Sequence, residues 1–214
     1  MLKFYHAPWS RSSAVLWLLE ELGIDYEVET VDIRAQVPES YRSVQPNKKV
    51  PAIDHDGTIV TERAAITLYL AETFPDAELN VPSGHPDRAR YLTMLVYCDS
   101  VFDPSLTAKA KGWQYVSNDF SFGLFDDMVG YVEKVLSERP FAAGGRFTAA
   151  DIQLASSIGF TMGVLKVLPQ RAAFVDYLAR IGERPAWQRA QTMDQELAMA
   201  TPYFKAQFNG QARD

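Results

Sequence analysis

Several serines stand close together just before the first helical pattern of the chain. Ser10, Ser12 and Ser13 precede residues 15–22, whose apolar residues have helical spacing. A hydroxyl at the beginning of a helix can cap a backbone N–H group, which serine favours, or help the helix dipole to hold an anion. One hydrogen bond to a charged group contributes about 1.5 to 3 kcal/mol. These serines therefore predict either a plain helix cap or a site for a small anionic group.

Charged residues gather at two later points. Lys48 and Lys49 precede a short apolar stretch, and Glu62 and Arg63 stand at the beginning of a second helical pattern. A cation in the first turn of a helix opposes the helix dipole, so Arg63 departs from a local rule. Two interpretations stay open: Arg63 contacts an anionic ligand, or it is a solvated surface arginine.

The elements that would position these residues follow a regular order. The sequence predicts a strand at 2–5, a helix at 15–22 closed by Gly23, a strand at 26–31, an irregular or weakly helical stretch at 34–43, strands at 50–53 and 58–60, and a helix at 61–70. The two later strands flank an Asp-Gly pair, a strong hairpin signal. The order β-α-β-(α)-β-β-α indicates a small α/β domain.

A change of pattern marks a boundary after this domain. Residues 74–86 carry prolines and polar residues without periodicity. The expected domains are therefore 1–76 and 87–209, joined by a linker at 77–86. Helices are predicted at 88–116, 122–137, 149–167 and 174–182, and a frayed tail is predicted at 209–214.

The helix expected from residue 149 begins with a clear signal. Thr148 and Asp151 have the spacing of a capping box, with Asp in place of the commoner Glu or Gln. Phe147 and Ile152 fit the accompanying hydrophobic staple. Loss of such a cap usually costs about 0.5 to 2 kcal/mol.

Composition excludes several classes of protein. The 214 residues carry a formal charge of -6, which argues against a nucleic acid partner. No long uncharged apolar stretch and no signal-like opening occur, so we expect no membrane partner and a cytoplasmic location. One cysteine, Cys98, and three scattered histidines predict neither an internal disulfide nor a metal site.

Three segments together resemble the cytosolic glutathione transferase superfamily. They are residues 49–53, 61–70 and 147–152, and they match the family in residue type, order and spacing. The resemblance covers nearly the whole chain and points to a bacterial member, serine-type or beta-, zeta- or theta-like. It implies a thioredoxin-like N-terminal domain followed by an all-helical C-terminal domain.

The resemblance also implies how glutathione would bind. In the family, a cis proline follows a valine whose backbone pairs with the cysteinyl backbone of glutathione, as an added strand does. Val50 and Pro51 stand at these positions. Glu62 would receive the γ-glutamyl ammonium, and Arg63, where the family usually has serine, the γ-glutamyl carboxylate.

The glycyl carboxylate would attract basic residues. Lys48, where the family usually has glycine, Lys49 and Arg34 are the candidates. Exposed basic residues are often merely solvated, so this part of the site is the least specific.

The reaction of the family needs a glutathione thiolate, since the thiol itself hardly attacks. Ser10 lies where the serine- and cysteine-type members carry their catalytic group, and Ser12 and Tyr5 are the alternatives. Residues 7–10 overlie the Cys-Pro-x-Cys motif of thioredoxin-like redox proteins but contain no cysteine. A disulfide reductase is therefore less expected than a transferase.

The electrophile would lie against aromatic side chains. The candidates are Trp9, Phe102, Trp113, Tyr115 and Phe204. Family members are usually two-fold dimers, so we expect a homodimer, in which Asp99 or Asp103 reaches the partner's glutathione.

The sequence thus predicts an enzyme that joins glutathione, as co-substrate, to apolar electrophiles. A relative that uses the same thiolate for dehalogenation, peroxide reduction or isomerisation remains open. So does a protein of this fold that binds ligands or proteins without turnover, as does a glutathione-dependent reductase.

Overall fold

The computed structural model describes residues 1–211 and divides the chain into two compact units. One, here the sheet unit, combines Met1–Ile66 with the chain from Arg184 onward. The other, the helical unit, is Thr67–Glu183. This observed division differs from the one predicted from the order of the elements. The prediction assigned the segment after residue 184 to the C-terminal domain, whereas that segment packs in the sheet unit. The expected domains 1–76 and 87–209 stay a prediction.

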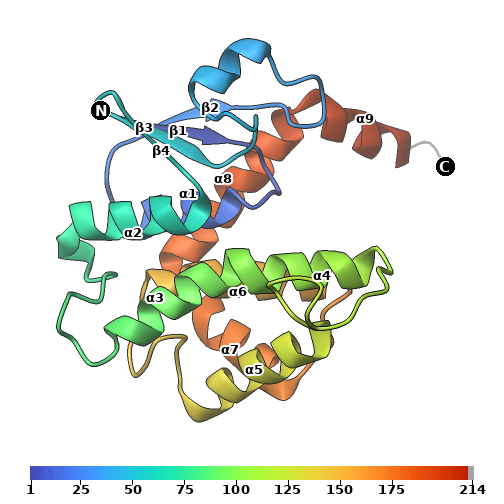
Figure 1. The fold of residues 1–214 in the computed structure, drawn as a ribbon. Coiled ribbons are helices and arrows are strands. Elements are labelled where there is room, and N and C mark those ends of the chain that lie inside the picture. The colour runs from blue at the N-terminus through green and yellow to red at the C-terminus, as the bar shows by residue number, and fades with distance from the viewer. Residues whose placement is uncertain (212–214) are drawn as a thin grey trace. The chain divides into compact units, whose positions relative to one another are not determined.

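Four strands form the sheet of the sheet unit (Figure 1). They are β1 Leu2–His6, β2 Glu27–Thr30, β3 Ala52–His55 and β4 Thr58–Thr61, in the spatial order β2-β1-β3-β4. β1 pairs with β2 in parallel, and β1 with β3 and β3 with β4 are antiparallel. The predicted hairpin is confirmed, because Asp56 and Gly57 both have positive φ, as its tight turn requires.

Helices cover both faces of this sheet (Figure 1). They are α1 Ser13–Leu22, the 3-10 helix η1 Glu39–Ser43 and α8 Pro185–Ala200, and α9 Pro202–Gln211 continues from the end of α8. α1 ends at Gly23 in the left-handed conformation, as predicted. Tyr5 packs with Tyr41 of η1 on one face, while α8 packs against α1.

Polar and aromatic contacts fix α8 to α1. The guanidinium of Arg184 donates to both carboxylate oxygens of Glu21, at 2.6 and 2.7 Å. The rings of Trp17 and Trp187 pack with centroids 4.7 Å apart. α8 and α9 were not predicted as separate helices, and the contacts that attach α8 join residues too far apart in sequence for periodicity to reveal.

The helical unit consists of short helices. They are η2 Pro75–Ala77, α3 Arg88–Tyr97, the π-helical turn η3 Cys98–Phe102, α4 Asp103–Ala110, α5 Phe125–Glu138, α6 Ala149–Gly159, the π-helical turn η4 Phe160–Val164 and α7 Ala172–Gly182. The helix expected over 88–116 is interrupted at η3 and ends at Ala110, because Gly112 adopts a positive φ. The capping box is confirmed: the Thr148 N–H donates to Asp151 at 2.8 Å.

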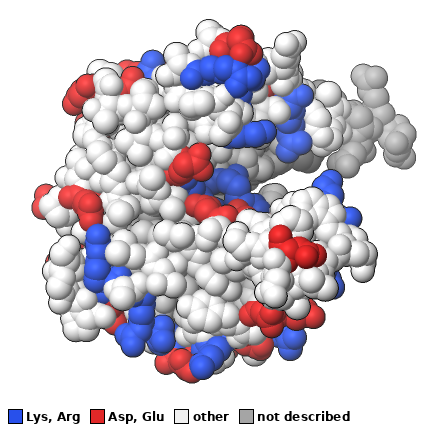
Figure 2. Space-filling model, viewed as in Figure 1, with Lys and Arg blue, Asp and Glu red and all other residues white. Residues whose placement is uncertain are grey.

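α2 Arg63–Thr73 carries the chain from one unit into the other. Of the predicted frayed tail, residues 209–211 belong to α9, and residues 212–214 lie outside the described residues. Within residues 1–211, no helix combines the length and the apolar character that crossing a bilayer requires. Acidic and basic side chains are mixed over the face drawn in Figure 2.

Candidate functional site

The register of the sheet brings three segments of the predicted site to one edge. Tyr5 of β1 pairs with Ala52 of β3, and Ala52 pairs with Thr61 of β4. The next residue outward on each strand is therefore His6, Pro51 and Glu62 respectively. The turn with the serines, the Val50-Pro51 pair and the beginning of α2 consequently lie at the same end of the sheet. The peptide bond between Val50 and Pro51 is cis, as the resemblance implied.

Ser10 lies in the turn that leads from β1 into α1 and remains partly accessible. Its Oγ donates to the carbonyl of Ala7 at 2.7 Å and accepts the backbone N–H of Ser12 at 3.1 Å. The hydroxyl thus satisfies one backbone donor at the beginning of α1, yet keeps a face open to a ligand. The structure allows Ser10 both of the roles that the sequence left open.

Ser12, the first alternative, is fully buried at the N-cap position of α1. Its Oγ accepts the N–H of Ala7 at 3.1 Å and lies 2.8 Å from the Oγ of Ser10. It also lies 2.7 Å from Nδ1 of His6. A side chain enclosed in this way stands behind Ser10 and does not face a ligand.

His6 and Asp194 were missed by sequence reasoning. Both are buried, and Nε2 of His6 lies 3.0 Å from Oδ1 of Asp194. The backbone N–H of Trp9, a residue with positive φ, donates to the same carboxylate at 3.2 Å. A histidine at the end of a strand beside the serines was the only available signal, and nothing in the sequence pairs it with α8.

The side chain of Tyr5, the second alternative, points to the face of the sheet opposite to that of His6, because successive residues of a strand point in opposite directions. Its ring packs 5.6 Å from that of Tyr41, in a cluster with Val31 and Ala52. Burial raises the pKa of the Tyr5 hydroxyl, which disfavours its ionised form. Tyr5 is therefore packed in this cluster beside η1.

Arg63 is buried, with 4% of its surface exposed, so the interpretation as a solvated surface arginine is wrong. It begins α2, while Glu62 before it is exposed and has positive φ. Gln45, which sequence reasoning missed, approaches Glu62 with its amide at 3.5 Å. The side-chain Oε1 of Gln45 accepts the backbone N–H of Lys49 at 3.1 Å, so Gln45 links the two predicted binding segments.

The three basic candidates for the glycyl carboxylate have different surroundings. The ammonium of Lys48 lies 3.1 Å from Glu39, whose pKa is lowered by Arg42 and Lys48. Lys49 is exposed. Arg34 lies over the rings of Tyr203 and Phe204, at 4.5 and 4.9 Å from their centroids. Lys48 and Arg34 are thus held by contacts within the sheet unit, and Lys49 stands exposed next to Val50.

The aromatic candidates fall into separate groups. In the sheet unit, Trp9 packs edge-on against Phe204 with centroids 4.6 Å apart. Phe204 also lines a small pocket with Ala7, Pro8 and Thr201. Trp9 belongs to the same turn as Ser10, and Phe204 reaches it from α9, so the two rings offer an apolar wall at this turn.

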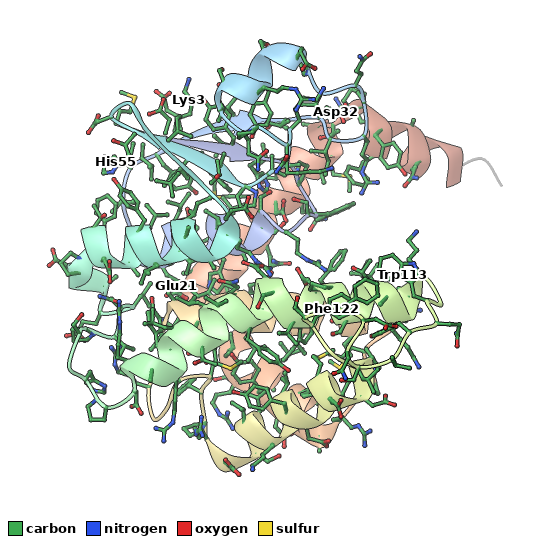
Figure 3. The ribbon with its side chains drawn as sticks, in the orientation of Figure 1. Lys3, Glu21, Asp32, His55, Trp113 and Phe122 are labelled. Carbon is green, nitrogen blue, oxygen red and sulfur yellow. The ribbon has the colours of Figure 1, made fainter. Side chains whose placement is uncertain are left out.

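The other aromatic candidates belong to the helical unit. Trp113 and Tyr115 contact Phe120, and Tyr115 also contacts Phe122, all in the segment between α4 and α5 (Figure 3). Phe102 is fully buried in η3, so its ring belongs to the core of the helical unit. Asp99 accepts a hydrogen bond from Gln153 at 2.9 Å.

A cleft of about 460 Å³ opens on the face that carries Tyr5. Its lining includes Tyr5, Glu29, Asp32 and Tyr41, and none of Ser10, Ser12 and Ser13 is among the residues that line it. Asp32, labelled in Figure 3, follows β2 by two residues.

The profile of the family described as "Glutathione S-transferase, N-terminal domain" matches residues 1–72. Glutathione S-transferase GstA of Escherichia coli O157:H7 is 27% identical over 201 residues, which cover 88% of this chain and 96% of that protein. Glutathione S-transferase 3 of Schizosaccharomyces pombe is 25% identical over 173 residues and covers 72% of each chain.

Solved structures resemble the whole chain. A glutathione transferase from Methylococcus capsulatus is 28% identical with a TM-score of 0.76, covering 91% of this chain and 99% of that one. A sphingomonad glutathione S-transferase, complexed with glutathione, is 28% identical with a TM-score of 0.73, covering 90% and 98%. The sheet, the helices and their order thus recur in both structures.

Proposed function

Since this chain belongs to the glutathione transferase superfamily, we propose that it binds glutathione at the sheet edge and transfers the sulfur to an electrophile. The chain is a glutathione transferase. What we propose is which side chain acts as its catalytic group and which kind of substrate it takes. The observation that carries them is the partly accessible hydroxyl of Ser10, which stands at the beginning of α1 and at the same sheet edge as Val50 and Pro51.

Glutathione would lie along this edge. β3 begins at Ala52, so Val50 extends the line of that strand beyond its last pair with β1. An extended cysteinyl segment can hydrogen-bond there as an added strand. The buried guanidinium of Arg63 and the exposed carboxylate of Glu62 supply charges opposite to those of the γ-glutamyl group.

Ser10 would stabilise the thiolate. A thiol has an ordinary pKa of about 8.5, and lowering it by about two units takes roughly 2.7 kcal/mol of preferential stabilisation. One hydrogen bond to a charged group gives about 1.5 to 3 kcal/mol, and the helix dipole adds to it. A single serine hydroxyl at the beginning of α1 therefore suffices.

The electrophile would be apolar and would contact Trp9 and Phe204, since these rings meet beside the Ser10 turn. We include in the proposal a homodimer and a cytoplasmic location, where thiols stay reduced. The buried single cysteine, Cys98, is compatible with that environment.

The first test is the ultraviolet absorbance of bound glutathione as a function of pH. We expect a thiolate that titrates well below pH 8.5 on the protein. S-methylglutathione, which has no ionisable thiol, is the matched ligand and should give no such signal. Retention on a glutathione column without any thiolate signal would favour a non-catalytic binding protein, and failure to bind would contradict the proposal.

A further inference from the structure

We propose that Ser12, His6 and Asp194 form a buried relay that takes up the proton of the glutathione thiol, so that thiolate formation leaves the proton inside the protein. The proposal rests on the proposed function, because it needs the sulfur at Ser10. It assigns a role to His6 and Asp194, which neither the sequence motifs nor the predicted site included, and gives Ser12 a role behind Ser10 in place of a direct contact with the sulfur.

The relay is a continuous chain of hydrogen bonds within the sheet unit. Ser10 Oγ lies 2.8 Å from Ser12 Oγ, Ser12 Oγ lies 2.7 Å from His6 Nδ1, and His6 Nε2 lies 3.0 Å from Asp194 Oδ1. Ser12 and His6 are fully buried and Asp194 is 3% exposed. Only Ser10, at one end, is partly accessible among these four side chains.

The direction of the bonds follows from the chemistry of the end groups. A carboxylate only accepts, so His6 Nε2–H donates to Asp194. In a neutral imidazole the other nitrogen is then an acceptor. The Ser12 hydroxyl has two acceptors within reach, Nδ1 at 2.7 Å and the carbonyl of Ala7 at 3.0 Å, and in the proposed relay it donates to the nearer one, Nδ1. The Ser12 oxygen is left to accept, and it accepts the Ala7 N–H already. Before glutathione binds, donation along the chain therefore runs inward, toward Asp194.

The hydroxyl hydrogen of Ser10 can also point inward, toward Ser12. Its two acceptors, the Ala7 carbonyl at 2.7 Å and Ser12 Oγ at 2.8 Å, lie at nearly equal distances. Rotation of the hydroxyl about the Cβ–Oγ bond of Ser10 exchanges one for the other. A thiol that donates to the Ser10 oxygen would then be the outermost member of an unbroken chain.

Proton transfer along the chain balances without any other reactant. The S–H bond breaks and a proton passes to Ser10 Oγ, the Ser10 proton passes to Ser12 Oγ, and the Ser12 proton passes to His6 Nδ1. Both serines end neutral, the sulfur is a thiolate and His6 is an imidazolium. The electron pair of the broken S–H bond stays on sulfur, and nothing is oxidised or reduced.

After this transfer, every hydrogen bond of the relay between His6 and the sulfur points the other way, toward the sulfur, as stabilisation of a thiolate requires. The imidazolium Nδ1–H now donates to Ser12, Ser12 donates to Ser10, and Ser10 donates to the thiolate. Before the transfer, the carboxylate of Asp194 accepts hydrogen bonds from the neutral imidazole of His6 and the backbone N–H of Trp9. After it, the imidazole 3.0 Å away is a cation. A buried ion pair of this kind is less unfavourable than a buried single charge.

The surroundings of His6 identify the right variant for a test. Asp194 also holds the backbone of Trp9, which has positive φ, so its replacement would disturb the turn as well as the relay. Phe4 lies beside the imidazole with centroids 5.1 Å apart and carries no charge. His6→Asn keeps an acceptor near the Nδ1 position but cannot take up a proton.

The decisive experiment is NMR of the protein with ¹⁵N-labelled histidine. The chain has three histidines, so each ring can be followed, and His55 and His85 serve as internal controls. On adding glutathione near neutral pH, we expect the His6 ring alone to change from the neutral to the imidazolium pattern. S-methylglutathione, which has no thiol proton, should leave it neutral, and His6→Asn assigns the signal.

Proton release gives a second, independent reading. With an indicator dye in weak buffer, the parent should release far fewer than one proton for each thiolate seen by absorbance, and His6→Asn about one. A parent that forms thiolate and releases a full proton, with a neutral His6, would overturn the relay while leaving the proposed function intact. Absence of thiolate in the parent would instead contradict the proposed function.

Discussion

The imidazole of His6 lies 3.0 Å from the carboxylate of Asp194, although the two residues are 188 positions apart in the chain. His6 ends the first strand and Asp194 belongs to α8. The contact ties the last part of the chain to the turn that carries Ser10. The turn that carries Ser10 is therefore supported by a helix of the same unit, and predictions about the candidate site involve both segments.

Replacement of Ser10 tests the thiolate assignment. Ser10→Ala should raise the pKa of bound glutathione by one to two units and lower kcat/KM about 10- to 100-fold, because one hydrogen bond to the anion is lost. Ultraviolet titration and steady-state kinetics measure the two effects. Ser100→Ala, on an exposed serine of η3, is the control and should change neither. Equal titration of parent and Ser10→Ala would move the role to the backbone of α1.

Replacement of Arg63 tests the γ-glutamyl contact. Arg63→Ala should weaken glutathione binding by about 10- to 100-fold, the effect of one charge-assisted hydrogen bond, and should affect kcat much less. Calorimetric titration measures the Kd. Arg90→Ala, which removes an exposed arginine paired with Asp87, is the matched control. Unchanged affinity in a folded Arg63→Ala protein would mean that the buried guanidinium has a structural role.

Replacement of Phe204 tests the apolar wall. Phe204→Ala should raise KM for an apolar electrophile about 10-fold, since contact area with the ring is lost, and leave KM for glutathione within about twofold. Trp113→Ala, in the helical unit, tests the second aromatic group in the same assay. Val175→Ala, on an exposed site of α7, controls for loss of an apolar side chain. If only Trp113→Ala alters KM, the electrophile contacts that group instead.

Asp151 should make stability depend on pH. Burial raises its pKa from 3.8 to about 6, against the hydrogen bonds that it accepts. The contribution of the protonated Asp151 carboxyl to the free energy of unfolding is therefore fully present below about pH 4. It is lost as pH rises through about 6, because the folded protein must then ionise a buried carboxyl. The rise corresponds to roughly 3 kcal/mol. Urea unfolding of the parent between pH 4 and 7, with Asp151→Asn as comparison, measures it.

The asparagine variant separates Asp151 from all other titrating groups. Its free energy of unfolding should fall less steeply between pH 4 and 6 than that of the parent. Identical slopes for the two proteins would refute the assignment to Asp151.

Two ion pairs of α8 offer a matched comparison. The Glu21 side chain is 7% exposed and Arg184 holds both of its oxygens, whereas Arg189 and its partner Glu20 are 54% and 15% exposed. Arg184→Ala should lower the free energy of unfolding by about 1 to 3 kcal/mol, because it leaves a buried carboxylate. Arg189→Ala should cost less than about 1 kcal/mol. Denaturant unfolding compares them, and equal costs would contradict the role of burial.

Local chemistry explains which parts of the fold were predictable. The left-handed cap at Gly23, the Asp56-Gly57 turn and the capping box at Thr148 depend on residues within a few positions of one another. All three predictions are confirmed. The helix expected over 88–116 was partly wrong, since periodicity does not register the change to a π-helical turn at η3.

The candidate site was predictable where its segments carry local motifs. Val50, Pro51 and Glu62 were predicted by type and spacing, and the register of β1, β3 and β4 brings their segments to one edge. The surface interpretation of Arg63 failed because burial is a property of packing, which a local charge rule does not contain. Gln45 carried no local signal at all.

By itself, the sequence determined the order of the elements from β1 to α2, the turns and caps named above, and the resemblance to the family, because these depend on short-range backbone preferences and on motif spacing. The tertiary structure alone decided which of the candidate hydroxyls stays accessible. Tyr5 points to the η1 face and Ser12 is enclosed, while Ser10 remains partly accessible. It also decided that His6 meets Asp194, since hydrogen bonds between distant segments form only when the packing of α8 against α1 brings them together.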